Sequence, residues 1–412
     1  VKFFEVGKKM RKFILSFMIV LAVLFIPFGL PFLRSEEDAV QTDEVMRAVW
    51  IAAVYNIDFP SRNNLTAAEM CAELDDIVQN TAAAGLNTIF FQVRPTADAL
   101  YKSAIFPSSR WLVPEEGDEL AIDPLAYLIQ AAAEKNIGVH AWLNPYKVTR
   151  GSADNPAFDL SYMVEDNPLR QYPQILVYHA NGEVFMNPGE PQSQELILQA
   201  VEELVENYDL AGIHYDDYFY PDGDFEDGET YAKYGAGYAS IEDWRRSNVD
   251  TLIKETYDLV KTSGKDMLFG VSPSVVWADK ASNPLGSNTY GGTESYYSHY
   301  ADSRKWVKEG WVDYLTPQIY WNIGYEPADY AVLANWWQEV AKGTKVKLYP
   351  GLALYKLGDA AQSDAWLDRE EILRQIELNR SLGINGECFY GYSKIKEDYL
   401  GIRERLGAYY AN

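Results

Sequence analysis

The chain has 412 residues, of which 48% are hydrophobic and 23% charged, as in a globular protein rather than a disordered one. Its formal net charge of −24 excludes a broad nucleic-acid-binding surface, because a protein this acidic would repel phosphate over most of its surface. With four His and two Cys, the chain offers few ligands for a zinc site. We expect no nucleic-acid partner, no metal and no cofactor.

The first 33 residues have the layout of a segment that targets a membrane. Four basic residues between positions 8 and 12 precede an apolar run over residues 13–33. This order is typical of a signal peptide or an uncleaved signal anchor, and we favour the anchor because no small-x-small cleavage site follows. Residues 34–45 are polar and acidic and are predicted to form a linker. The positive flank should stay inside, which places the rest of the chain outside the cytoplasmic membrane.

From residue 46 to 412, short runs with strand character alternate with longer helical patterns. The predicted strands span 47–54, 88–95, 138–145, 212–221, 267–274, 312–321, 347–357 and 386–393. The predicted helices span 66–84, 124–136, 192–207, 240–263, 296–309, 328–341, 369–382 and 396–406. Eight strands, each followed by a helix, predict an α/β fold with a single (β/α)₈ TIM barrel. The two long insertions, 155–191 and 222–239, both follow a strand, on the face where such barrels keep their active sites.

The predicted fourth strand carries the strongest candidate for chemistry. Because side chains alternate along a strand, His214, Asp216 and Tyr218 should share the side that faces the barrel interior or mouth. Asp216 and Asp217 are adjacent carboxylates, and such crowding raises the pKa of one of them, as general acid catalysis requires. The structural alternative is that Asp217 caps the following loop or pairs with Arg245 or Arg246.

Other strand ends supply polar groups and aromatic rings that would suit sugar hydroxyls and sugar ring faces. The remaining candidate substrate-binding residues are Arg94, Asp98, Tyr101, Trp142, Asn144, Ser272, Gln318, Tyr320, Trp321 and Tyr355. Each of them could instead be packing or loop support. Cys71 and Cys388 could form one disulfide or remain two buried thiols, and both alternatives stay open.

Several motifs resemble the glycosyl-hydrolase-like family 10. They are the segments 46–50 (MRAVW), 91–95 (FQVRP), 140–146 (HAWLNPY), 243–246 (DWRR) and 270–273 (GVSP), together with the Asp-Asp strand. The resemblance covers residues 46–393 in order. It implies a barrel hydrolase acting on an amino-sugar polymer, since bacterial members of the family include an outer-membrane lipoprotein that hydrolyses peptidoglycan glycans stripped of stem peptides. This chain has no lipobox Cys, so its anchor must differ.

The fourth strand also resembles that of family 18 chitinases, whose motif ends Asp-x-Asp-x-Glu-Tyr-Pro. Asp216 matches an Asp of that motif, but Tyr218 occupies the position of the acidic Glu. This mismatch leaves the general acid open between Asp217 and a loop carboxylate such as Asp98 or Glu326.

These observations predict a glycoside hydrolase of the cell envelope, with Asp216 and Asp217 as the catalytic pair and a polysaccharide, plausibly a peptidoglycan-type glycan, as substrate. A catalytically inactive glycan-binding protein would keep the aromatic residues without needing paired carboxylates. A structural envelope scaffold would bind no glycan at all.

Overall fold

The computed structural model of the chain describes residues 45–149, 160–180, 182–384 and 386–411. The predicted membrane-targeting segment and residues 34–44 of the predicted linker lie outside these ranges, so both stay predictions. In the described part of the chain, no helix combines the length and the apolar character needed to cross a membrane.

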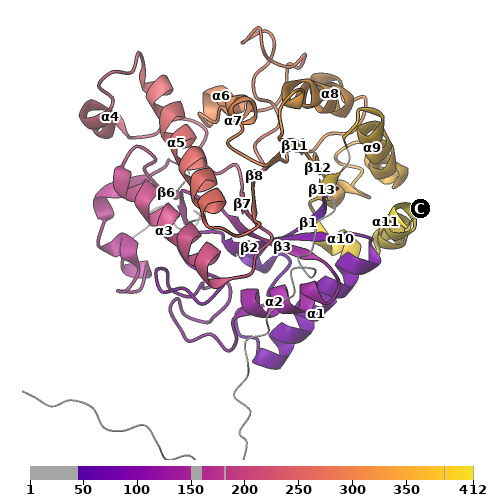
Figure 1. The fold of residues 1–412 in the computed structure, drawn as a ribbon, viewed down its shortest axis with the longest axis horizontal. Helices are drawn as coiled ribbons and strands as arrows, with labels where there is room; N and C mark the ends of the chain where they lie inside the picture. The colour runs from indigo at the N-terminus through magenta and orange to yellow at the C-terminus, as the bar shows by residue number, and fades with distance from the viewer. Residues whose placement is uncertain (1–44, 150–159, 181, 385, 412) are drawn as a thin grey trace, which may run out of the picture. The chain divides into compact units, whose positions relative to one another are not determined.

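A parallel sheet lies at the centre of the described fold, with helices around it (Figure 1). Each pairing between neighbouring strands of this sheet is parallel. Its strands are β1 (Arg47–Ile51), β2 (Thr88–Arg94), β3 (Gly138–Leu143), β7 (Gly212–Tyr215), β8 (Leu268–Val271), β9 (Tyr314–Leu315), β10 (Gln318–Ile319), β11 (Lys347–Leu348), β12 (Gly351–Leu352) and β13 (Glu387–Phe389).

The sheet curls so that its pairings lead back to β1. Only residues 316–317 separate β9 from β10, and only residues 349–350 separate β11 from β12. Pro317 and Pro350 lie in these gaps, and a proline has no N–H to donate to a strand ladder. β8 pairs with β9, β10 with β12, β12 with β13, and β13 with β1. The curled parallel sheet with helices between its strands confirms the prediction of an α/β fold of the TIM-barrel type.

Helices follow the strands in chain order. They are α1 (Ala67–Ala83), α2 (Pro124–Ala133), α3 (Pro191–Asn207), α4 (Gly228–Tyr234), α5 (Ile241–Thr262), α6 (Ser295–Ser298), α7 (Ser303–Glu309), α8 (Tyr330–Ala341), α9 (Glu370–Ser381), α10 (Tyr392–Lys396) and α11 (Ile402–Tyr410). One helix predicted as continuous is broken, and another begins later than predicted. Tyr300, at φ 51°, interrupts the predicted helix 296–309 between α6 and α7. The predicted helix 396–406 begins only at Ile402, after Asp398 and Leu400, which are also at positive φ.

Local sequence signals explain where several helices begin. Thr66 and Glu69 form a capping box at the start of α1, in which each side chain bonds the backbone N–H of the other residue. Asp123 caps α2 just ahead of Pro124, whose missing N–H would have had no partner in the first turn. Pro191 opens α3 for the same reason.

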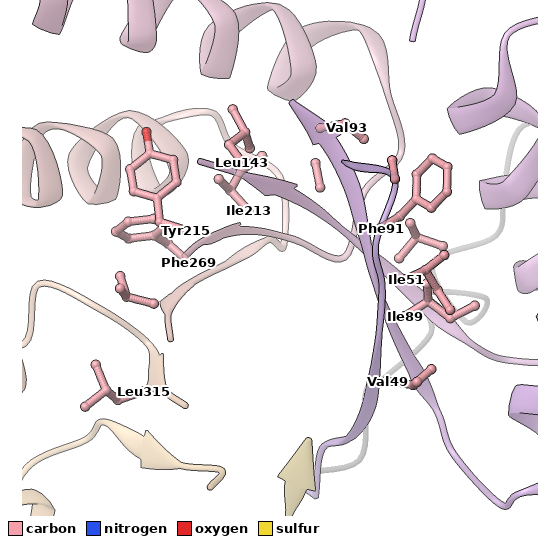
Figure 2. Packing of buried hydrophobic residues seen from close by; sticks show 14 of the residues in the cluster. Val49, Ile51, Ile89, Phe91, Val93, Leu143, Ile213, Tyr215, Phe269 and Leu315 are labelled. Atoms are coloured by element: carbon pink, nitrogen blue, oxygen red, sulfur yellow. The ribbon is translucent and has the colours of Figure 1, made fainter. Parts of the chain in front are cut away.

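The two faces of the sheet pack differently. Alternate residues such as Ile51, Phe91 and Ile213 belong to the large hydrophobic cluster that the strands form with the helices (Figure 2). The opposite positions form a smaller cluster around Trp50, Phe90 and Trp142. Within it, the ring of Phe90 stacks on His214 at a centroid distance of 4.1 Å. Aromatic side chains therefore fill much of the interior of the curled sheet.

The insertion after β3 contains a small sheet that the sequence did not predict. Its strands are β4 (Lys147–Thr149), β5 (Leu176–Tyr178) and β6 (Val184–Met186), and β6 pairs antiparallel with the other two. The second insertion carries the short helix α4. Both insertions follow the carboxyl ends of their strands, as predicted.

The cysteines are not joined. Cys71 on α1 is half-buried, Cys388 on β13 is fully buried, and both are free thiols. This excludes the disulfide alternative in the structure. Burial raises the pKa of the Cys388 thiol well above its usual value.

Candidate active site

A pocket of about 180 Å³ opens at the carboxyl ends of the strands. Backbone hydrogen bonds continue the ladder just past the strands here: Asp216 donates its N–H to Leu143 O at 3.1 Å, and Ser272 donates to Tyr215 O at 2.9 Å. The carboxyl ends of β3, β7 and β8 therefore lie side by side at the same edge of the sheet. The pocket is lined by Trp50, Val54, Ile57, Gln92, Trp142, Asn144, Lys147, Asp216, Asp217, Tyr218, Ser272, Gln318, Tyr320 and Tyr390.

Asp216 lines this pocket and is 8% exposed. Its Oδ1 accepts hydrogen bonds from Gln318 Nε2 at 2.9 Å, from the Asp217 N–H at 2.9 Å and from Ser272 Oγ at 3.4 Å. Burial, followed by repulsion from Asp217, raises the pKa of Asp216 well above its ordinary value, and a hydrogen bond between the two carboxyl groups adds to the shift. The pair therefore holds a proton under conditions in which an exposed Asp would have lost it.

Asp217 is less buried and contacts a different set of groups. Ser274 Oγ donates a 2.7 Å hydrogen bond to its Oδ2. The same hydroxyl lies 3.5 Å from Nδ1 of His299, whose Nε2 lies 3.3 Å from Asp222 Oδ1. Burial lowers the pKa of His299, but the hydrogen bond to Asp222 and the charges of Asp217 and Asp222 outweigh it and raise the pKa. His299, a group that can become a cation, is thus linked to Asp217 through Ser274.

His214 supports the pocket from below, inside the curled sheet. It is fully buried, and burial followed by repulsion from His140 lowers its pKa well below the usual value, so the ring is neutral. Trp50 Nε1, which can only donate, bonds His214 Nε2 at 3.2 Å. The proton of His214 therefore sits on Nδ1, where it faces Tyr314 Oη at 3.0 Å. Ser272 Oγ lies 3.0 Å from the same Nε2 and links this network to Asp216.

A second hollow of about 270 Å³ adjoins the first pocket, since Lys147, Asp217 and Tyr218 line both. Its other walls include His299 and, from the insertion after β3, His179 and Phe185. Lys147 Nζ forms a 2.7 Å ion pair with Glu183 Oε1 and lies 4.4 Å from the ring centre of Phe185.

The structure brings together eight of the fourteen predicted site residues. These are Trp142, Asn144, Asp216, Asp217, Tyr218, Ser272, Gln318 and Tyr320. Arg245 does not pair with Asp217: it binds Asp227 through two hydrogen bonds, and Arg246 pairs with Asp243. The structural alternative for Asp217 as an arginine partner is therefore wrong.

The other six predicted residues do not line the pocket. Arg94 is fully buried and donates to Pro145 O at 2.9 Å, beside the ring of Phe106. Asp98 is buried and accepts hydrogen bonds from Thr96 and Ser109 at 2.8 Å each. The remaining four serve in packing: Tyr101 bonds Glu203, His214 lies below the pocket, Trp321 stacks on Tyr325, and Tyr355 packs edge-on against Tyr320.

The positions of the carboxylates restrict which group can act as the general acid. Neither Asp98 nor Glu326 lines either hollow. Asp216 and Asp217 are the carboxylates that line the first pocket among the described residues. Nor does any described group of three His, Cys, Asp or Glu residues have an arrangement that could hold a metal ion.

The candidate site residues taken from the sequence leave out four polar or aromatic residues of the pocket. Trp50 and Gln92 lie on β1 and β2 at positions that the strand alternation would have selected. Gln92 Oε1 accepts the N–H groups of Ala53 and Val54 and fixes the loop that follows β1. Tyr390 follows β13 directly, so its place at a strand end was a usable signal. Lys147 had no such signal, because it belongs to the unpredicted small sheet.

The sequence model of the family described as "Glycosyl hydrolase-like 10" matches residues 45–368. The chain is 38% identical to the glycosyl hydrolase YngK of Bacillus subtilis over 97% of this chain and 77% of that protein. It is 35% identical to the glycosyl hydrolase DigH of Escherichia coli K12 over 87% of this chain and 84% of DigH.

Two solved structures share the fold at 12% identity. The glycoside hydrolase domain of PgaB (BpsB) from Bordetella bronchiseptica has a TM-score of 0.55 and covers 88% of this chain and 97% of its own. The α-L-fucosidase isoenzyme 2 of Paenibacillus thiaminolyticus has a TM-score of 0.56 and covers 89% of this chain and 49% of its own.

Proposed function

The chain belongs to the glycosyl hydrolase-like 10 family and is a glycoside hydrolase, and we propose that it cleaves an amino-sugar polymer of the cell envelope, of the peptidoglycan glycan type. The observation that carries the proposal is the adjacent pair Asp216 and Asp217 in a pocket that is also lined by Trp and Tyr side chains. Aromatic plates with a few placed polar groups suit sugar rings. A catalytically inactive glycan-binding protein would not need two adjacent carboxyl groups, of which Asp216 is buried and has a raised pKa.

In the proposed reaction, the pair supplies the proton for the leaving group. The proton passes to the glycosidic oxygen as the bond between that oxygen and C1 breaks, and the bonding electrons go to the oxygen. The sugar ring passes through an oxocarbenium-like transition state, and the carboxylate left behind stabilises its positive charge. Water then adds to C1 and returns a proton to the pair, which restores the enzyme.

The adjacency of the two carboxyl groups favours help from the substrate. Hydrolases in which two carboxylates flank the bond hold them about 5 Å apart for retention or about 6.5–9.5 Å for inversion. Asp216 and Asp217 are instead neighbours that share a hydrogen bond. A 2-acetamido group would fill the missing role: its carbonyl oxygen bonds C1 as the leaving oxygen departs, and Asp216 stabilises the charge on the amide nitrogen. The water that then attacks C1 breaks this bond, its electrons return to the carbonyl oxygen, and the acetamido group is restored. An amino-sugar polymer provides this group.

The proposed place of action is outside the cytoplasmic membrane, with the N-terminal segment as signal anchor or signal peptide and as the contact with the membrane. The four basic residues ahead of the apolar run support it. Protease added to intact protoplasts should digest the barrel. A protected barrel would refute this localisation.

Digestion of purified wall glycan, with and without its stem peptides, followed by mass analysis of the products, tests the substrate. Saccharide fragments should appear with the wild-type protein and not with Asp216→Asn. A neutral polysaccharide without acetamido groups serves as the control substrate. Cleavage of that control but not of wall glycan would refute the amino-sugar assignment.

A further inference from the structure

The two hollows described above differ in the carboxyl groups that they contact. Asp216 lines the first pocket alone, whereas Asp217 lines both. In glycoside hydrolysis, the sugar that develops positive charge needs both groups near it, while the general acid must reach the oxygen that joins two sugars. Asp217 is the carboxyl group that stands at the boundary between the hollows.

The lining of the second hollow is aromatic and charged. Tyr218 contributes a half-buried ring, whereas Phe185 and Tyr220 line the hollow with little exposed surface, 2% and 1%. Its charged groups are largely matched within the protein, because Lys147 pairs with Glu183 at 2.7 Å and His299 with Asp222 at 3.3 Å. Matched charges with aromatic walls favour a neutral, hydroxylated ligand over a strongly charged one.

We propose that the second hollow binds the saccharide unit that leaves, so that the scissile bond lies over Asp217 and the first pocket holds the sugar whose C1 is attacked. This inference rests on the proposed function, which it extends to the other side of the scissile bond. Asp217 then gives the shared proton to the leaving oxygen. His299, held through Ser274, is a positioning residue for Asp217.

The insertion after β3 explains why this site exists. Lys147 lies on β4, Phe185 on β6, and His179 directly after β5. The small sheet thus forms one wall of the second hollow, next to the mouth of the curled sheet. The insertion therefore lets the enzyme recognise at least two saccharide units at once, which suits cleavage inside a polymer.

His179→Ala tests the proposal, with Tyr178→Ala as a matched control. The two residues are neighbours, but Tyr178 is 50% exposed and lines neither hollow. Each variant is assayed on an amino-sugar oligosaccharide and on an aryl glycoside with the same glycone, whose small leaving group cannot fill the hollow. His179→Ala should lower kcat/KM for the oligosaccharide about tenfold more than for the aryl glycoside, and Tyr178→Ala should not alter the ratio.

The outcomes separate the two proposals. Equal effects of His179→Ala on both substrates, or none, would overturn the inference while the function stands. No cleavage of either substrate by the wild-type protein would refute the proposed function. Calorimetry of oligosaccharide binding to Asp216→Asn then tests the site by itself: adding His179→Ala must weaken that binding severalfold, and unchanged affinity would overturn the site. The melting temperatures of His179→Ala and Tyr178→Ala must match that of the wild type, and the double variant must match Asp216→Asn at the same pH.

Discussion

Nε2 of Gln318 donates a 2.9 Å hydrogen bond to Oδ1 of Asp216, although 102 residues separate them in the sequence. Nε2 also donates to Ser272 O at 2.8 Å, so the amide is held in one orientation. β10, β8 and the end of β7 thus meet at a single carboxylate. These hydrogen bonds hold the Asp216 carboxylate in one orientation in the pocket.

Asp216→Asn should abolish hydrolysis, because it removes the ionisable group and keeps the shape. We expect kcat to fall by at least about a hundredfold, the lower range for a lost acid–base group. Steady-state assays on a confirmed glycan substrate check this. Most of the activity remaining would remove Asp216 from the catalytic pair.

The same variant should change how stability depends on pH. The pKa of Asp216 is raised in the folded protein from a usual value of 3.8. The folded state therefore binds more protons than the unfolded one above pH 3.8, and the wild type loses stability as pH rises from there through the folded pKa. Asp216→Asn lacks this loss. Its melting temperature should rise relative to that of the wild type as the pH of the melts increases from 4 to 8, and a constant difference would contradict the assignment.

Asp217→Asn should slow hydrolysis in a way that depends on the leaving group. Substrates with poor leaving groups need protonation most and should suffer most, whereas an activated aryl glycoside should suffer least. A plot of log kcat against leaving-group pKa should be steeper than for the wild type. Parallel plots would show that Asp217 does not deliver the proton.

Trp142 is both a pocket wall and part of the interior cluster. The side chain is 4% exposed, so Trp142→Ala would open a cavity that costs about 3–5 kcal/mol. Trp142→Phe is the better probe, since no described residue accepts a hydrogen bond from its buried Nε1–H. If the ligand or a water bound with it does so, calorimetry should show weaker glycan binding by about 1 kcal/mol, the net worth of one hydrogen bond. The melting temperature should fall much less than in Trp142→Ala, because most of the buried ring volume is kept.

Asp227→Asn should destabilise the fold without involving the pocket. Asp227 is 1% exposed and holds Arg245 through bonds of 2.9 and 2.5 Å. Removing one charge leaves the other buried and unpaired, which costs about 3–5 kcal/mol. Denaturant unfolding should record the loss. A loss well below 1 kcal/mol would mean that water reaches Arg245 freely.

His299→Gln tests the charge behind Asp217. The pKa of His299 is raised in the fold, so the stability that its cation contributes is fully present below pH 6.5 and is lost as pH rises through the folded pKa. The wild type should melt higher than His299→Gln at pH 5.5, and the difference should shrink as the solution becomes alkaline. Asp222→Asn removes the partner of His299 and should reduce the same difference.

Most of the site residues that could be predicted from the sequence follow from the alternation of side chains along a strand. It selects Trp142, Asn144 and Asp216 because each lies on the inward side near the end of its strand. It fails for Arg94, because the register between β2 and β3 shifts between Gln92 and Arg94, and such an irregularity turns the side chain that follows it. The hydrogen bonds that produce the shift are tertiary, so no local pattern announces it.

The fold likewise has parts that the sequence predicts and parts that it does not. Long helices with caps, and the strands β1, β2 and β3, were predicted to within a few residues. The predicted fourth strand ran six residues past the end of β7, and the predicted sixth and seventh strands are each divided in two. The three-residue strands of the inserted sheet were not predicted, since strands this short hold together through packing rather than through any pattern of their own. The wall that this small sheet forms in the second hollow could therefore not be predicted from the sequence.

The free thiol of Cys388 gives the barrel a built-in reporter. The side chain lies on β13 with no exposed surface, in the interior cluster, whereas Cys71 sits half-buried on α1. An alkylating reagent should modify Cys71 in the folded protein and reach Cys388 only when the strands around it separate. The second, slow modification would then time the opening of the barrel, and saccharides that bind across the strand ends should lengthen that time.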